Sequence, residues 1–177
     1  MSNSKKTRTV SFRVPEDTIS NIEKEARTNL TSTNVLINQI LLQYVSWDKF
    51  EHRMKMFPVA EDILHYILDS FDESQRKESI DMTFNAIRDW ALISKKKFDI
   101  HSCLQVLEDY CRMVGISVEE STSLGTRTFV IRHALGRKAS IFIEELIEKI
   151  FWEIVKIKVD FDSTSTTVIA KLQSKFD

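Results

Sequence analysis

The chain has few residues that interrupt regular structure: three glycines and two prolines among 177 residues, while 42% of its residues are hydrophobic. This composition is typical of a compact folded chain and not of a disordered one. The length suits a small module plus one further domain. With a formal net charge of −1, the protein lacks the overall positive charge of proteins that coat nucleic acid without sequence preference.

Other absences limit the compartments and the kinds of chemistry that we expect for this protein. No apolar run approaches the ~18 residues of a membrane span, and no secretory signal is recognised, so we expect no membrane partner and a cytoplasmic location. Cys103 and Cys111 lie on one expected helix, which argues against a mutual disulfide and for structural thiols in a reducing compartment. The histidines are scattered, so we predict no metal site, no cofactor and no catalytic set, and therefore no enzyme.

The segment before Pro15 alternates in polarity. Three apolar side chains alternate with three polar ones, Val10, Phe12 and Val14 with Thr9, Ser11 and Arg13. This period of two indicates a strand with one apolar face. No second strand pattern occurs until beyond residue 115, so the strand is expected to pair with the same strand of a second chain about a two-fold axis. The sequence therefore predicts a homodimer, or a higher oligomer built from it, that exposes Thr9, Ser11 and Arg13.

Two helices are expected after this strand. Pro15 stops the strand and suits a helix start, and the acidic Glu16 and Asp17 favour the positive end of the helix dipole. This helix should end near Asn29. Ser32 is the expected N-cap of a second helix that continues through Trp47 to about residue 53. Its apolar stripe is broad enough to contact both the first helix and a partner: Leu36, Ile37, Ile40, Leu41 and Tyr44.

The stretch TRTVSFRVPED, followed by a helix and then TSTNVLINQIL, resembles the ribbon-helix-helix DNA-binding fold of the Arc, MetJ and CopG repressors. The resemblance covers residues 7–50. It implies that Thr9, Ser11 and Arg13 read bases and that the start of the second helix, Ser32, Thr33 and Asn34, grips a phosphate. Many members carry glycine in the turn where this chain has Asn29 and Leu30. We expect Asn29 to adopt the left-handed conformation there.

The same roles follow from the chemistry of the residues. Arg13 can donate two parallel hydrogen bonds to guanine, and short hydroxyl residues let a ribbon enter the major groove deeply. The free amides of a helix N-terminus bind anions. Three cations precede the strand, with no acidic residue before Glu16, and are expected to contact phosphates: Lys5, Lys6 and Arg8. The alternative is that the polar side chains decorate an exposed ribbon and that Ser32 is only a cap.

The sequence divides into residues 1–55, the ribbon-helix-helix and dimerisation domain, and residues 56–177, an α+β regulatory or interaction domain. Three apolar stripes predict three helices in the second domain: Val59, Ile63, Ile67 and Phe71; Ile80, Phe84, Ile87 and Ala91; Leu104, Leu107, Cys111 and Val114. Strands at 116–124 and 127–133, a helix at 137–155 and a strand at 166–172 follow, with a short strand possible at 158–161. This order indicates a helix-rich α+β chain with a small, mostly antiparallel sheet.

One segment of the second domain, HALGRKAS, combines a histidine at a strand end with a glycine, two cations and a helix start. It is a candidate pocket for an anionic ligand: His133, Gly136, Arg137, Lys138 and Ser140. The segment resembles the C-terminal portion of uncharacterised microbial, archaeal-type ribbon-helix-helix proteins, and that resemblance supplies no function. The alternative is a buried or capping histidine beside a plain turn glycine.

These patterns together predict a sequence-specific DNA-binding transcriptional regulator, in the simplest case a repressor, with double-stranded operator DNA as its partner. The second domain would sense an effector, contact a protein or extend oligomerisation. The alternative function is an interaction protein, such as an antitoxin-like module whose second domain captures a partner. The periodicity of that domain favours an independent fold over the disordered tail that such a module would carry.

Overall fold

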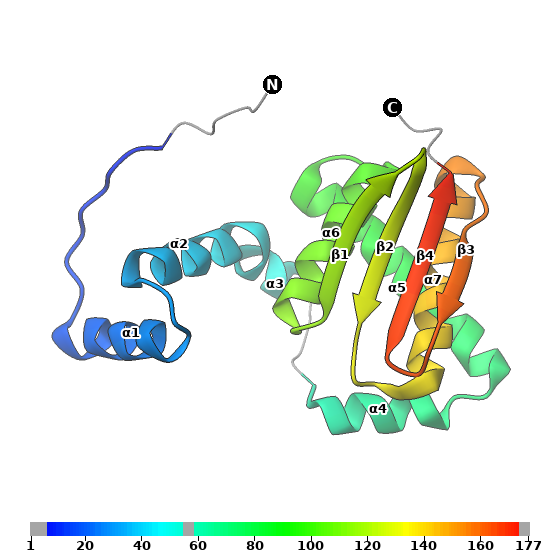
Figure 1. The fold of residues 1–177 in the computed structure, drawn as a ribbon, viewed down its shortest axis with the longest axis horizontal. Helices are drawn as coiled ribbons and strands as arrows, with labels where there is room; N and C mark the ends of the chain where they lie inside the picture. The colour runs from blue at the N-terminus through cyan, green and yellow to red at the C-terminus, as the bar shows by residue number, and fades with distance from the viewer. Residues whose placement is uncertain (1–6, 55–58, 174–177) are drawn as a thin grey trace. The chain divides into compact units, whose positions relative to one another are not determined.

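The computed structural model describes residues 7–54 and 59–173. Its contacts divide the chain into two compact units, with the division between Val45 and Ser46. This division lies upstream of the predicted domain boundary after residue 55. The chain is α+β and rich in helix, with a four-stranded antiparallel sheet in the second unit (Figure 1). No helix within the described ranges is long and apolar enough to cross a membrane.

The first unit contains the two expected helices, α1 (Glu16–Thr28) and α2 (Thr33–Gln43). Pro15 precedes α1, and the hydroxyl of Ser32 caps α2, as predicted. The turn between the helices differs from the prediction, because Asn29 has φ −87° and Leu30 is the left-handed residue, with φ 51°. The amide of Thr31 donates to the carbonyl of Ala26 and that of Leu30 to Arg27, a Schellman ending that requires the left-handed residue at Leu30.

The second helix continues into the second unit, as the sequence predicts. A π-helical turn, η1 (Tyr44–Asp48), follows α2 and leads into α3 (Lys49–Met54). Trp47 lies on this π turn and is buried in the second unit, where its indole contacts Trp90 (ring centroids 3.6 Å apart) and Tyr110 (5.7 Å). A π turn changes the direction in which the helix presents its side chains, and here it accompanies the burial of Trp47.

The three predicted helices of the second unit are present: α4 (Glu61–Ser70), α5 (Glu73–Trp90), which ends in a π turn, η2 (Ala91–Lys95), and α6 (Ile100–Met113). Side chains fix two of the helix starts. Asp72 and Gln75 form a reciprocal capping box at α5, and Asp99 accepts from the amide of Ser102 at α6. Hydrogen bonding to Ser102 lowers the pKa of Asp99, because those bonds favour the carboxylate.

The sheet begins with a hairpin of β1 (Ser117–Ser123) and β2 (Thr126–Arg132). After α7 (Gly136–Val155) come β3 (Asp160–Ser163) and β4 (Thr167–Gln173), so the short strand that the sequence allowed before the last one is present. The strand order is β1-β2-β4-β3, and every neighbouring pair is antiparallel. The last strand is therefore central, and it pairs Ile131 with Val168.

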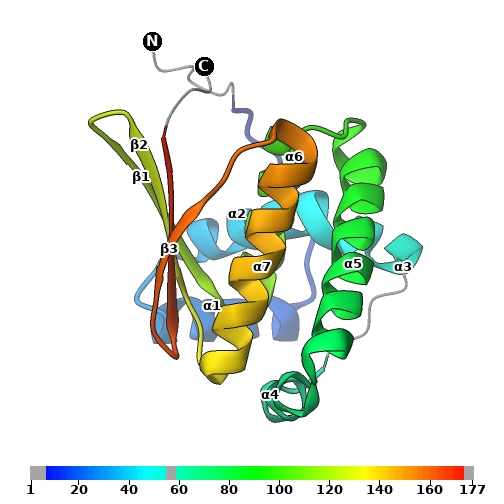
Figure 2. The ribbon, with the colours of Figure 1, turned by 90° about the vertical axis from the view of Figure 1, so that its right-hand side faces the viewer.

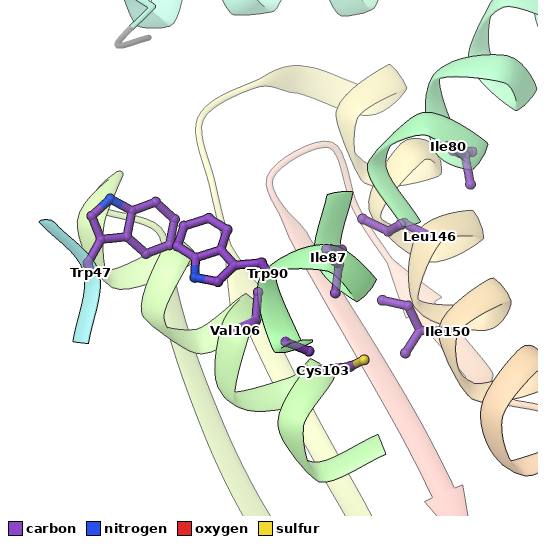
Figure 3. Close-up of a cluster of buried hydrophobic side chains, with 9 residues drawn as sticks. Trp47, Ile80, Ile87, Trp90, Cys103, Val106, Leu146 and Ile150 are labelled. Carbon is purple, nitrogen blue, oxygen red and sulfur yellow. The ribbon is translucent and has the colours of Figure 1, made fainter. Parts of the chain in front are cut away.

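Helices α5, α6 and α7 form two layers on one face of this sheet. Figure 2 shows α6 and α7 beside the sheet and α5 beyond them. One core cluster lies among the helices and includes Trp47, Trp90, Val106 and Ile150 (Figure 3). A second cluster joins α7 to the sheet through residues such as Phe151 and Val168. Both clusters share α7, whose stripe of Phe142, Leu146, Ile150 and Ile154 packs in the first of them.

The stripe of Val59, Ile63, Ile67 and Phe71 predicts the helix correctly, but most of the stripe is not packed. Val59, Ile63 and Ile67 are exposed, and Phe71 is partly buried. The residues of α4 that are partly covered are Leu64, His65 and Leu68. The apolar residues of the helix span one broad side, so periodicity alone could not identify which part of that side packs against the fold.

Candidate nucleic-acid interface and the His133 cluster

The segment proposed as a ribbon, residues 7–15, forms no strand within the single chain. The base-reading candidates Thr9, Ser11 and Arg13 are exposed. Two of the alternating apolar side chains are exposed as well, Val10 at 61% and Phe12 at 60% of their full area. Val14, the third apolar residue of the alternation, is partly covered, so the described chain buries none of the three.

The two helices of the first unit leave most of their apolar surface uncovered. Among the described residues of this unit, only Ala26 is buried. The large apolar side chains that are exposed, besides those of the ribbon segment, are Leu30, Val35, Ile40, Leu41, Leu42, Tyr44 and Val45. Monomeric proteins rarely expose apolar residues at this density, and large exposed patches mark interaction surfaces. Among its described residues, the first unit therefore exposes far more large apolar side chains than it buries.

The start of α2 has the features of an anion site. The hydroxyl of Ser32 accepts from the amide of Val35 (3.2 Å), and the carbonyl of Ser32 accepts from Leu36 (3.0 Å). Within the described chain the amides of Thr33 and Asn34 have no hydrogen-bond partner, as is usual for the first positions of a helix. The hydroxyl of Ser32 therefore caps the helix as an acceptor and is not the group that would bind a phosphate. A phosphate would be held by the two backbone amides that follow it.

The predicted cations of the arm are only partly placed. Arg8 is exposed and, like Arg13, forms no ion pair with any described residue. Lys5 and Lys6 lie outside the described residues.

The residues of the second predicted site do converge, at the point where β2 leads into α7. His133 and Ser140 are buried. The amide of Leu135 donates to Nδ1 of His133 (3.2 Å), so the neutral ring carries its proton on Nε2 and donates it to the hydroxyl of Ser140 (3.1 Å). That hydroxyl in turn donates to the carbonyl of Thr164 (2.7 Å). Burial lowers the pKa of His133, which keeps the ring neutral and this chain of bonds intact.

The two cations of the cluster donate hydrogen bonds to backbone carbonyls. Arg137 donates to the carbonyls of Ser163 (3.2 Å) and Thr164 (3.3 Å), and Lys138 donates to those of Asp69 and Phe71. Gly136 has φ +79°, and a Cβ there would lie 3.0 Å from Nε2 of His65. The position thus requires glycine for both its conformation and its close neighbour.

These contacts join four elements: the end of β2, the start of α7, the β3–β4 turn and the end of α4. The four side chains of the cluster, His133, Arg137, Lys138 and Ser140, all form hydrogen bonds within the fold, which supports the structural alternative over the ligand pocket. Sequence reasoning missed Thr164, whose carbonyl receives two of the bonds; it is distant in sequence and carries no local signal. Across residues 7–54 and 59–173, no three His, Cys, Asp or Glu side chains converge in the manner of metal ligands.

No protein-family model and no curated protein matches this chain.

Proposed function

We propose that the protein is a sequence-specific DNA-binding transcriptional regulator whose active form is a two-fold dimer. The observation that carries the proposal is the unfinished first unit. Its apolar side chains are spaced for burial, yet within one chain Ala26 alone among its described residues is buried. A second copy completes it: two segments at residues 9–14 pair as an antiparallel ribbon, and the paired helices cover Val10 and Phe12.

The polar side of such a ribbon has the chemistry of a major-groove reader. Each copy presents Thr9, Ser11 and Arg13 together on the face opposite Val10 and Phe12. Arg13, which pairs with no carboxylate among the described residues, would donate its two parallel bonds to a guanine. The free amides at Thr33 and Asn34 would hold the flanking phosphates and set the register of the ribbon on the duplex.

Repression is the simplest mode of action for this arrangement. A small dimer bound to an operator excludes polymerase from that stretch of DNA and needs no catalytic group. The second unit, with its own two core clusters, is assigned the regulatory or assembly role.

Selection of bound sequences from random duplex DNA at physiological salt tests the proposal directly. Wild type is expected to enrich a short, two-fold-related site. Arg13→Ala should lose the preference at one base pair in each half-site, at a cost of about 1 to 3 kcal/mol. Arg27→Ala, which removes an exposed cation from the last turn of α1, is the matched control and should retain the wild-type site. Failure of folded, dimeric protein to enrich any sequence would refute the proposal.

The basic arm gives a second, separable readout. Replacing Lys5 or Lys6 by alanine should weaken binding to operator and random DNA equally, and should reduce the dependence of affinity on salt concentration by about one counterion. Equal losses on both DNAs after Arg13→Ala would instead place Arg13 among the phosphate contacts.

A further inference from the structure

The helix that leads from the first unit into the second is irregular at one point, the π-helical turn η1. This turn follows α2 directly and continues into α3. A π turn holds one residue more than the α-helical turn that it replaces, and single π turns inside α-helices are frequent at functional sites. Trp47 lies on η1 and, among the described residues, is the largest side chain that is almost completely buried.

The contact between Trp47 and Trp90 is crowded. Their ring centroids are 3.6 Å apart (Figure 3), whereas aromatic pairs ordinarily lie about 4.5 to 7 Å apart. Trp90 is followed directly by the second π turn, η2. Both indoles of the pair therefore come from helices that depart from α geometry where the rings meet. Overpacked side chains raise the free energy of the folded state.

The indole N–H of Trp47 adds another cost. Its Nε1 is buried and has no hydrogen-bond acceptor in the part of the chain that the structure describes, whereas Trp90 carries no such atom. A buried indole N–H normally finds an acceptor, and a bond left unmade costs the desolvation of the group. Burial of the large apolar ring opposes these costs. The position of Trp47 is thus a balance between terms of opposite sign.

We propose that η1 is a two-state helical junction. It exchanges between the π turn, with Trp47 against Trp90, and a regular α-helical turn in which Trp47 leaves this site. One residue of an α-helix corresponds to a rotation of about 100°. Moving the extra residue out of the turn therefore turns the Trp47 side chain by up to that angle. The change relieves the crowded contact and lets the N–H bond to water.

The position of η1 in the chain makes it a means of coupling. The division between the two units falls inside the turn, between Val45 and Ser46. A ligand that binds the first unit more tightly in one state of the turn shifts the exchange toward that state. The inference goes beyond the proposed function and does not depend on it, because a bound protein or small molecule would act through η1 in the same way as DNA.

Fluorine NMR of the full-length chain tests the exchange. The chain has three tryptophans, Trp47, Trp90 and Trp152, so labelling with 5-fluorotryptophan gives three signals, which single phenylalanine variants assign. Saturation transfer should connect the Trp47 signal to a second one with the solvent isotope shift of an exposed ring. Trp152, half-exposed on α7, is the internal control and should show one state. A single, solvent-shielded Trp47 signal would overturn the proposal.

Deletion of Val45 links the exchange to the geometry of the turn. The variant lacks the residue that η1 holds in excess, so its Trp47 signal should lie at the position of the minor wild-type signal. Val45→Ala keeps the length of the turn, and this matched control should retain the wild-type signals. A Trp47 signal that stays at the buried position after the deletion would contradict the two-state turn. The wild-type spectrum decides by itself if the deletion variant does not fold.

Matched phenylalanine variants measure the strain at the contact. Trp47→Phe and Trp90→Phe each shrink one ring of the same pair, but only the first removes a buried N–H without an acceptor. The melting temperature of the second unit should therefore fall less for Trp47→Phe than for Trp90→Phe. An equal or larger fall for Trp47→Phe would show that Trp47 is not strained beside Trp90, and the proposal would fail.

Discussion

The two units of this protein place equally regular apolar patterns in opposite environments. In the second unit, stripes on α5, α6 and α7 meet one another and the sheet in two buried clusters. In the first unit, patterns of the same regularity lie on the surface, and Ala26 is its single buried described residue. The difference teaches that a regular apolar pattern does not by itself bring burial within the same chain.

The largest expected effect is on the stability of the second unit, which buries its apolar stripes within one chain. Trp47→Ala removes a side chain that is 1% exposed and packed between Trp90 and Tyr110. We expect a loss of about 3 to 5 kcal/mol from the free energy of unfolding of this unit, because the cavity is large and its neighbours are rigid rings. Urea unfolding followed by circular dichroism measures it. Trp152→Ala, at a half-exposed position, should cost much less; equal losses would mean that Trp47 is not a core residue.

The next effect tests the dependence of the first unit on a partner. Phe12→Asp places a charge on the apolar face of the proposed ribbon, and dimer formation would bury two such charges. We expect the free energy of dimer association to weaken by about 2 to 4 kcal/mol. Thr9→Asp, on the polar face, is the control for dimerisation. If both variants dimerise like wild type in sedimentation experiments, Phe12 does not lie in the dimer interface.

A pH titration separates the buried histidine from the exposed surface. Burial lowers the pKa of His133 from the ordinary 6.5. As the pH falls below about 6.5, the unfolded chain therefore binds a proton that the folded chain does not, and stability decreases until the lowered pKa is reached.

His133→Phe should remove this part of the pH dependence. It should also cost about 1 to 3 kcal/mol at neutral pH, because the amide of Leu135 and the hydroxyl of Ser140 lose a partner. The exposed His101→Gln controls for the loss of a histidine elsewhere in the same unit. An unchanged acid limb in the His133→Phe unfolding data would show that His133 does not carry it.

The smallest effects compare one turn from each unit. Leu30 (φ 51°) and Leu124 (φ 48°) are both left-handed and almost fully exposed. Leu30→Gly and Leu124→Asn should each stabilise their unit by about 0.5 to 1 kcal/mol, since they relieve backbone strain and remove no packing. Thermal unfolding measures both, and Thr28→Gly, within α1, should be destabilising. A destabilising Leu30→Gly would indicate that Leu30 makes contacts in the dimer.

Much of the secondary structure followed from local signals. Pro15 and Ser32 marked the helix starts of the first unit, and the period of two after Gly115 marked the first hairpin. Errors arose where two local solutions were similar in energy. Asn29 was the better candidate for a left-handed turn residue, yet the Schellman geometry puts Leu30 in that position. On α4 the face with the longer apolar stripe is the exposed one.

The His133 cluster was also predicted only in part from the sequence. Sequence order placed His133, Arg137, Lys138 and Ser140 near one another, and the structure brings them together. The groups that they bind, the carbonyls of Thr164, Ser163, Asp69 and Phe71, come from segments far away in the chain. Cations that lie beside a histidine indicate a ligand site only when their N–H groups are not already donating to backbone carbonyls.

The sequence by itself determined the order of the helices and strands and the helix starts at Pro15 and Ser32, because these depend on neighbours within a few residues. Only the tertiary structure decided that β4 is a central strand, that His133 is neutral within a closed set of hydrogen bonds, and that Trp47 belongs to the second unit. Each of these depends on contacts between residues that are far apart in the chain, and no local pattern encodes which distant group will be the partner.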